Sequence, residues 1–346
     1  MALNPLAFTE NVVRNFLRYQ MTTYPLEDQR LNSQLRNLLS MDETRNTPLL
    51  KGPYVSLSRS FAQGAKVEDL IAEDVLHPFM ANLIPYSNVY GHQEQAIRSI
   101  CGGKTTLVST GTGSGKSECF LYPIISKCLQ LKDADAEPGI SAVIVYPMNA
   151  LAEDQMDRLR DLLAGTGVTF GLYVGNTARD PSGVIGERLP PHASGADFRE
   201  RKERMRSEGS AETLRPPEEV CDRQTMRTPG KQPRILITNV NQLELLLTRQ
   251  LDIGMFDGAT LDYFVFDEAH TFSGASGAEA SCLIRRLRSY CGKDPLQTTC
   301  VATSATIVDE RNPDAALDFA SRFFGVPAEE VETVNETYQR DDWKEN

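Results

Sequence analysis

Residues 105–118 read TTLVSTGTGSGKSE, a β-rich run followed by a glycine-rich loop and the start of a helix pattern. Glycines in such a loop let successive backbone N–H groups converge on one anion, and the N-terminus of the next helix adds its positive end. Lys116 supplies a cation for the β and γ phosphates, and Ser117 supplies a hydroxyl ligand for magnesium. The stretch predicts a P-loop whose nucleotide-binding residues are Thr112, Gly113, Ser114, Gly115, Lys116 and Ser117.

One residue of this loop departs from the generic pattern, because Thr110 stands where the first glycine is usual. A flexible glycine loop without a ligand is the alternative. The strand pattern before the loop and the helix pattern after it favour the P-loop.

A second motif, YFVFDEAH at residues 263–270, ends another β-rich run with two carboxylates. Asp267 is placed to hold magnesium, usually through water, and Glu268 to take the proton from an attacking water. His270 stands two residues further on; it could simply cap the following helix, but its closeness to Glu268 favours a role in coupling the site to the rest of the molecule. Four such residues alone would be a weak signal, but the P-loop upstream makes the pair specific.

Short β-rich runs alternate with helix patterns from about residue 90 onward. Their β-branched and aromatic content is typical of parallel strands covered by helices on both faces. We therefore predict a doubly wound α/β fold with ligands at the carboxyl ends of the strands. The predicted strands are residues 105–109, 142–146, 168–174, 235–238, 263–267 and 298–304.

The pattern also predicts the organisation of the chain around this sheet. Residues 1–80 are expected to form a helical N-terminal extension, and residues 81–325 the nucleotide-binding unit. Residues 178–233 are too long and polar for a simple crossover, so we predict an insertion there. Residues 326–346 are expected to be a linker.

Composition limits the class of protein. Of 346 residues, 40% are hydrophobic and 24% charged, as in globular proteins with a sizeable core. No apolar run approaches the roughly 18 residues that span a bilayer, and Glu10 interrupts the stretch where a signal peptide would be apolar. We expect a cytoplasmic protein without membrane contact. The seven cysteines form no CxxC pair, which argues against a disulfide framework and a zinc ribbon.

The net charge of −11 does not favour nucleic-acid binding, which normally needs a basic face. Any such contacts should therefore be local and made largely by backbone amides. The densest positive block is FRERKERMR at residues 198–206, inside the predicted insertion. It is either a solvated helix or an arm that holds a duplex through phosphate contacts.

These motifs, in this order, resemble the superfamily-2 helicases. VYGHQEQAI resembles the Q motif, whose glutamine, here Gln93, reads adenine. TGTGSGKS resembles motif I, YPMNALAEDQ motif Ia, ILITNVNQLELLL motif Ib, DEAH motif II and TSAT motif III. The resemblance implies the first RecA-like lobe of a P-loop NTPase that uses ATP and Mg²⁺.

The resemblance also assigns residues that would bind nucleic acid. Motifs Ia and Ib imply contacts to the sugar–phosphate backbone by Asn149, Ala150, Gln155, Thr238 and Asn239. For Asn149 and Asn239 a plain helix cap is the alternative. Motif III implies a hinge between ATP and nucleic acid at Ser304, Ala305 and Thr306, where small hydroxyl residues could otherwise be simple turn formers.

Two longer phrases resemble narrower families. DEAHTFSGASGAEASCLIRRLR is similar to bacterial DNA helicases of the mitomycin-repair type. The N-terminal phrases LNPLAF, KGPYVSLSRSF and LHPFM resemble the large prokaryotic helicases of anti-phage systems such as DISARM and Druantia. These likenesses imply an ATP-dependent DNA helicase or translocase in anti-phage defence or DNA repair, acting on a single strand or a duplex junction more readily than on RNA.

Other functions share some of these motifs. A non-hydrolysing ATP-binding or DNA-docking switch module is the main alternative, and measured turnover would separate it from a motor. A restriction-type motor subunit shares every motif. Helicases of this kind close a second RecA-like lobe, with its arginine finger, onto ATP. We expect that lobe to come in cis from a longer protein or in trans.

Overall fold

The computed structural model describes residues 4–23, 25–39, 59–111, 113–305 and 314–339. The chain divides into two compact units, Met1–Arg59 and Ser60–Asn346. The first contains helices α1 (Pro5–Thr23) and α2 (Gln29–Leu39). On α1 the apolar side chains of Phe8 and Val12 are exposed.

The helical extension ends earlier than the predicted residue 80. Residues from Ser60 onward pack with the second unit, where they form β1 (Gln63–Lys66), α3 (Val67–Ala72) and the 3₁₀ helix η1 (Pro78–Asn82). Leu70, Leu76 and Met80 lie fully buried in the main core. Their burial explains the earlier boundary, because apolar side chains are most stable where they leave water completely.

The second unit is built on a parallel sheet of seven strands, in the order β11-β3-β10-β9-β4-β8-β5. The six predicted strands are all present, with slightly different ends. They are β3 (Thr105–Ser109), β4 (Ala142–Tyr146), β5 (Phe170–Leu172), β8 (Ile235–Asn239), β9 (Tyr263–Phe266) and β10 (Thr299–Ser304). This confirms the doubly wound α/β prediction.

Helices cover both faces of the sheet, and neighbouring strand residues point to opposite cores. On β4, Ile144 belongs to the core with the first group of helices and Val143 to the core with the second. The first group is α4 (Gly91–Cys101), α5 (Lys116–Asp133) and α6 (Asn149–Leu163). The second is α9 (Val240–Thr248), α11 (Gly274–Tyr290) and α12 (Asp314–Phe324).

The seventh strand, β11 (Val331–Asn335), lies in the range expected to be a linker. It pairs in parallel with β3, from Val331 opposite Thr105 to Asn335 opposite Ser109. Val331 and Val334 are buried against the core, which corrects the linker interpretation for these residues. The sequence VETVN has only two strongly apolar positions, so its strand signal is weak; pairing with β3 stabilises it at the sheet edge.

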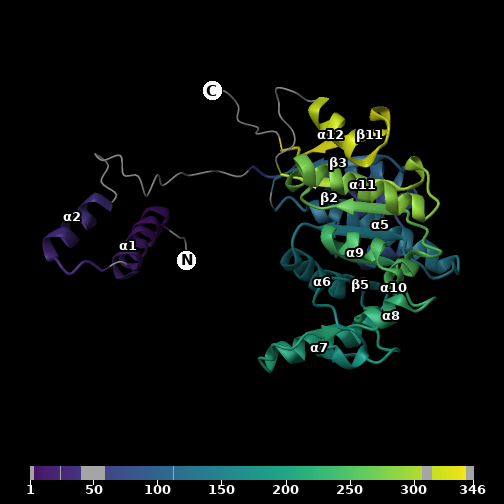
Figure 1. Ribbon diagram of the computed structural model, residues 1–346, viewed down its shortest axis with the longest axis horizontal. Helices are drawn as coiled ribbons and strands as arrows, with labels where there is room; N and C mark the ends of the chain where they lie inside the picture. The colour runs from purple at the N-terminus through teal and green to yellow at the C-terminus, as the bar shows by residue number, and fades with distance from the viewer. Residues whose placement is uncertain (1–3, 24, 40–58, 112, 306–313, 340–346) are drawn as a thin grey trace. The chain divides into compact units, whose positions relative to one another are not determined.

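The predicted insertion lies beyond the opposite edge, next to β5 (Figure 1). It contains η2 (Pro181–Gly183), β6 (Glu187–Arg188), α7 (Gly195–Ser207), β7 (Leu214–Arg215) and α8 (Arg223–Arg227). Phe198, Met205 and Leu214 form a small core of their own with Ala164 at the end of α6. The insertion is therefore a folded element packed on the sheet unit.

Two findings bear on the composition arguments. No helix in the described part of the chain is long and apolar enough to cross a membrane. The cysteines are free thiols, and only Cys282 among them is exposed.

Candidate nucleotide site and nucleic-acid surface

The glycine-rich loop connects the end of β3 to the first residue of α5. Gly113 and Gly115 have φ values of +81° and +79°, a left-handed conformation that strongly favours glycine. A Cβ at Gly115 would also come within 2.4 Å of Gln93 Nε2. Both glycines are thus required by backbone geometry, as a phosphate-binding loop demands. Thr112 lies outside the described residues.

Lys116 lies at the N-terminus of α5, with its side chain only 10% exposed. Its Nζ donates a 3.0 Å hydrogen bond to the Thr110 carbonyl and lies 3.6 Å from Glu268 Oε1. The fully buried Ser114 hydroxyl donates to the Gly111 carbonyl, so it shapes the loop. Lys116 thus contacts both the glycine-rich loop and Glu268, which follows the C-terminal end of β9.

Asp267 follows directly after β9, next to β10 in the sheet. The Thr303 hydroxyl donates to Asp267 Oδ1 and accepts a 3.0 Å hydrogen bond from the Glu268 N–H. Burial raises the pKa of Asp267, and the Glu268 charge adds to this, while the Thr303 hydrogen bond and Lys116 oppose it.

The chemistry of the predicted magnesium ligands suits that ion. Burial makes a negative charge on Asp267 costly, and a hard divalent cation beside the carboxylate would offset that cost. The Ser117 hydroxyl and Asp267 are oxygen ligands of the kind that Mg²⁺ prefers, with phosphate oxygens and water completing its shell. The predicted donor set therefore fits the ion.

Glu268 has left-handed backbone angles, φ 50° and ψ 47°. For a residue with a Cβ this conformation costs roughly 1–2 kcal/mol, and such strain clusters at functional sites. Glu268 Oε2 lies 3.3 Å from His270 Nδ1, and Ser304 Oγ lies 3.4 Å from the same nitrogen. The two carboxylate oxygens thus face Lys116 on one side and His270 on the other.

Motif III also contacts the glycine-rich loop, because the Thr110 N–H donates a 3.1 Å hydrogen bond to the Ser304 carbonyl. Ala305 is the last described residue of this stretch, and Thr306 lies outside the described residues. Thr303, the first residue of motif III, contacts both acids. Only the pairing of β10 with β9 places it there.

Gln93, on α4, lies beside the loop and is almost fully buried. Its Oε1 accepts from the Tyr90 N–H at 2.9 Å, and its Nε2 donates to the Gly115 carbonyl at 3.2 Å. Both ends of the side-chain amide are therefore bonded within the protein. Adenine recognition by Gln93 stays a prediction, and the second N–H of Nε2 and the second lone pair of Oε1 are the groups that could take part in it.

Motifs Ia and Ib meet at the carboxyl ends of β4 and β8, which are neighbours in the sheet. Asn239 Nδ2 donates a 2.6 Å hydrogen bond to Asn149 Oδ1. Asn239 also caps α9 by accepting from the Gln242 N–H, whereas the residue before Asn149 is the cap position of α6. The cap alternative therefore holds for Asn239 and not for Asn149.

The remaining predicted nucleic-acid residues are placed differently. Ala150 is exposed next to Asn149. Thr238 is fully buried, and its hydroxyl donates to the Tyr173 carbonyl. Gln155 is half-buried, and its Oε1 points away from solvent without a hydrogen-bond partner. The structure thus brings Asn149, Ala150 and Asn239 together at the surface, whereas Thr238 is buried and Gln155 is half-buried.

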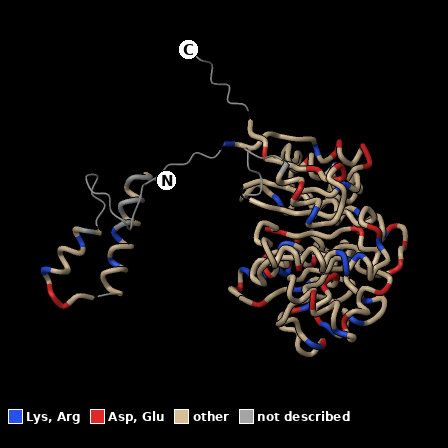
Figure 2. Tube along the Cα trace, turned by 45° about the horizontal axis from the view of Figure 1, so that its top comes forward, with Lys and Arg blue, Asp and Glu red and all other residues tan. Residues whose placement is uncertain are grey.

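Three of the five basic side chains in the block at residues 198–206 bind carboxylates of the same unit. Arg201 binds Glu187 at 2.6–2.7 Å, Lys202 binds Asp161 of α6 at 2.5 Å, and Arg204 binds Glu200 at 2.8 Å. Figure 2 shows blue and red segments interspersed along the trace. The block therefore fits the solvated-helix alternative better than a free basic arm.

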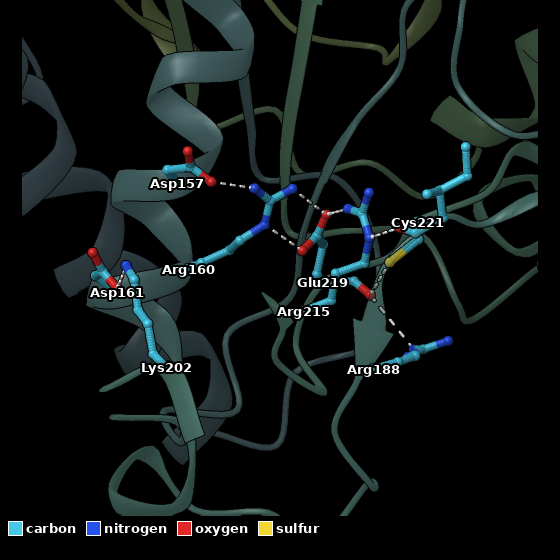
Figure 3. A network of polar contacts seen from close by, with 9 residues as sticks. Asp157, Arg160, Asp161, Arg188, Lys202, Arg215, Glu219 and Cys221 are labelled. Atoms are coloured by element: carbon cyan, nitrogen blue, oxygen red, sulfur yellow. Dashed lines mark hydrogen bonds and ion pairs between the residues drawn. The ribbon is translucent and has the colours of Figure 1, made fainter. Parts of the chain in front are cut away.

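A buried ion pair joins the insertion to the motif Ia helix (Figure 3). Arg160 of α6 donates to both carboxylate oxygens of Glu219, at 2.7 and 2.8 Å, and Arg215 donates to the same carboxylate. The Glu219 side chain is only 2% exposed. No sequence pattern indicated this pair, because its members lie 59 residues apart.

Comparison with known proteins identifies relatives of this chain. The DEAD/DEAH box helicase family model matches residues 90–184 and 198–314, more than half of the chain, and its gap falls inside the insertion. Druantia protein DruE of Escherichia coli (strain UMEA 4076-1) is 28% identical over 378 residues, covering 86% of this chain and 20% of its own length. The uncharacterized ATP-dependent helicase YprA of Bacillus subtilis is 25% identical and covers 64% of this chain and 23% of its own length.

Solved structures share the fold. DUF1998 helicase MrfA bound to DNA superposes with a TM-score of 0.54 at 22% identity, over 80% of this chain and 31% of MrfA. The DEAD-box helicase Mss116 bound to single-stranded RNA gives 0.54 at 19% identity, over 79% of this chain and 46% of Mss116. The chain spans about a fifth of the length of the two curated relatives above.

Proposed function

Because the chain belongs to the DEAD/DEAH box helicase family, we propose that it is the ATP-binding and ATP-hydrolysing unit of a DNA helicase or translocase. The observation that supports this most directly is the position of Glu268. Its carboxylate lies between Lys116 and His270 at the carboxyl ends of the strands, next to the glycine-rich loop. This is a cation, a base and a coupling group within contact of one another.

Each residue of the site has a proposed role. The loop amides and Lys116 bind the phosphates, and Ser117 with Asp267 would hold Mg²⁺, which would stabilise negative charge on the phosphates. Glu268 accepts the proton of the attacking water. Thr303 keeps the two acids in position through its contacts to both. Glu268 contacts His270, and His270 contacts Ser304 of motif III, so a movement of Glu268 is passed to motif III through these two contacts.

The surface formed by Asn149, Ala150 and Asn239 is the proposed contact to nucleic acid. Small polar side chains and exposed amides bind phosphate without adding positive charge, which suits an acidic protein. DNA is the proposed substrate because residues 267–288 resemble bacterial DNA helicases. MrfA, which shares the fold, was solved with DNA, and Mss116, which also shares it, with single-stranded RNA. Anti-phage defence, as in Druantia, or DNA repair is the proposed pathway.

A complete motor also needs a second RecA-like lobe, with an arginine finger, closing on ATP. We propose that this lobe is provided in cis in a longer protein or in trans. The proposal agrees with the small share of the relatives' length that this chain spans.

Nucleotide binding and nucleic-acid coupling test the proposal together. Purified protein should bind a fluorescent ATP analogue in the presence of Mg²⁺, and Lys116→Ala should weaken binding roughly 10- to 100-fold, since a hydrogen bond to a charged group is worth about 1.5–3 kcal/mol. Equal affinity in mutant and wild type would refute the phosphate role. In the two-lobed protein, turnover stimulated by DNA more than by RNA supports a DNA motor; ATP binding without turnover supports the non-hydrolysing switch module.

A further inference from the structure

The segment that follows β11 reaches the glycine-rich loop. The Gly111 N–H donates a 2.8 Å hydrogen bond to Glu336 Oε2. Gly111 lies directly before Thr112, the first of the residues predicted to bind nucleotide. One carboxylate of the chain therefore binds a donor of the loop that is proposed to bind nucleotide.

Glu336–Gln339, here called the strap, is held to the start of the second unit. Two backbone hydrogen bonds of 2.8 and 2.9 Å and one ring stack join it to Ser60–Ala62. Tyr338 OH donates to Glu336 Oε1 at 2.5 Å, which orients the carboxylate. Residues 337–339 are exposed, so these contacts lie at the surface. Surface hydrogen bonds of this kind are each worth little net free energy, so the strap can detach.

The residues that hold the strap also touch the nucleotide site. The Phe61 ring, which stacks on Tyr338, contacts the rings of Tyr90 and His92 at 5.3 and 5.2 Å between centroids. His92 Nε2 in turn lies 2.8 Å from the Ser114 carbonyl oxygen of the loop. Attachment of the strap and the shape of the loop are thus linked by direct contacts.

The charge of Glu336 determines whether the attached strap favours or opposes nucleotide binding. Partial burial by itself would raise the pKa of Glu336, but hydrogen bonds from Tyr338 and the Gly111 N–H and the nearby His92 and Lys116 lower it overall. The carboxylate is therefore ionised at neutral pH. The Glu336 carboxylate and a nucleotide's phosphates are both anionic, so they repel each other when both lie beside the loop and Lys116.

We propose that Glu336 is a built-in competitor of the nucleotide phosphates, and that a nucleoside triphosphate displaces it and releases the strap from Ser60–Ala62. The inference rests on the proposed nucleotide-binding function and adds its regulation. Because coupling between two binding events is reciprocal, the strap weakens nucleotide binding by the factor by which nucleotide weakens the strap.

Binding affinity tests the competition. Glu336→Gln removes the charge and keeps a similar shape, so it should bind Mg²⁺ with a non-hydrolysable ATP analogue about tenfold more tightly, as expected for loss of one charged contact. Glu332→Gln is the matched control, because it removes the same charge from β11 at a residue that contacts Gln95 instead of the loop. Unchanged or weaker affinity in Glu336→Gln overturns the proposal.

Hydrogen exchange tests the release. The Ala62 and Gln339 amides, which bond across the strap, should exchange faster when the analogue is bound. Slower or unchanged exchange overturns the proposal. Lys116→Ala distinguishes failure of the proposed nucleotide binding from failure of the proposed competition by Glu336. If Lys116→Ala binds the analogue as tightly as wild type, the nucleotide function fails; if it binds weakly while Glu336→Gln gains nothing, only the competition fails.

Discussion

Two glutamates of this molecule, Glu268 and Glu219, each face a basic side chain, but their surroundings differ. Glu219 is bound by Arg160 through both oxygens at 2.7 and 2.8 Å, and Arg215 adds a third contact. Glu268 lies 3.6 Å from Lys116 and has a strained left-handed backbone. The Glu219 side chain is 2% exposed and that of Glu268 is 24% exposed.

The difference separates a structural carboxylate from a chemical one. A buried carboxylate that is fully hydrogen-bonded holds its neighbours in place, and its removal leaves buried charges without a partner. A carboxylate held loosely beside a cation can accept a proton and change partners during a reaction. We therefore expect substitutions at Glu268 to lower ATP turnover without changing the free energy of unfolding. Substitutions at Glu219 should lower the free energy of unfolding without changing nucleotide binding.

The largest expected effect is on turnover. Glu268→Gln keeps the shape of the side chain but removes the proton acceptor, so ATP hydrolysis by the two-lobed protein should fall roughly 10²- to 10⁴-fold. Nucleotide affinity and the midpoint of thermal unfolding should stay near wild type. Glu279→Gln, an exposed position on α11, is the control for loss of one negative charge. Normal turnover in Glu268→Gln would assign the base to another residue.

The next effect is on stability. Glu219→Ala leaves Arg160 and Arg215 without their shared carboxylate and should lower the free energy of unfolding by about 3 kcal/mol. Denaturant unfolding measures this, with exposed Glu200→Ala as the matched change in the same insertion, expected to cost about 1 kcal/mol or less. Nucleotide affinity of the folded Glu219→Ala protein should be unchanged. A loss of nucleotide affinity in Glu219→Ala as large as that in Lys116→Ala would contradict the purely structural role of Glu219.

The smallest effect concerns the basic block of the insertion. Arg201, Lys202 and Arg204 already bind carboxylates of the same molecule, in pairs that are partly or largely exposed. Replacing all three with alanine should cost about 0.2–1 kcal/mol per pair. DNA affinity measured across a salt series should keep its slope. A slope flatter by about one unit per lost charge would show that these side chains bind phosphate and would restore the arm hypothesis.

Much of the candidate site was predictable because its residues are neighbours in sequence and end strands. Gly113, Gly115 and Lys116 take the positions that the loop pattern implies, and Asp267 and Glu268 follow β9 as expected. Thr238 and Gln155 show the limit of motif likeness. Both belong to the expected motifs, yet one is buried and the other is half-buried with its oxygen turned inward, because the motif does not state which side of the backbone meets solvent.

By itself the sequence determined six of the seven strands, their parallel arrangement and the residues at their carboxyl ends. These follow from local hydrophobic patterns and from the glycine loop, which act over a few residues. Only the tertiary structure decided that VETVN joins the sheet, that Arg160 meets Glu219 and that Glu336 reaches Gly111 across 225 residues of chain. Such contacts carry no periodic signal, because a charged residue finds its partner through the packing of distant elements.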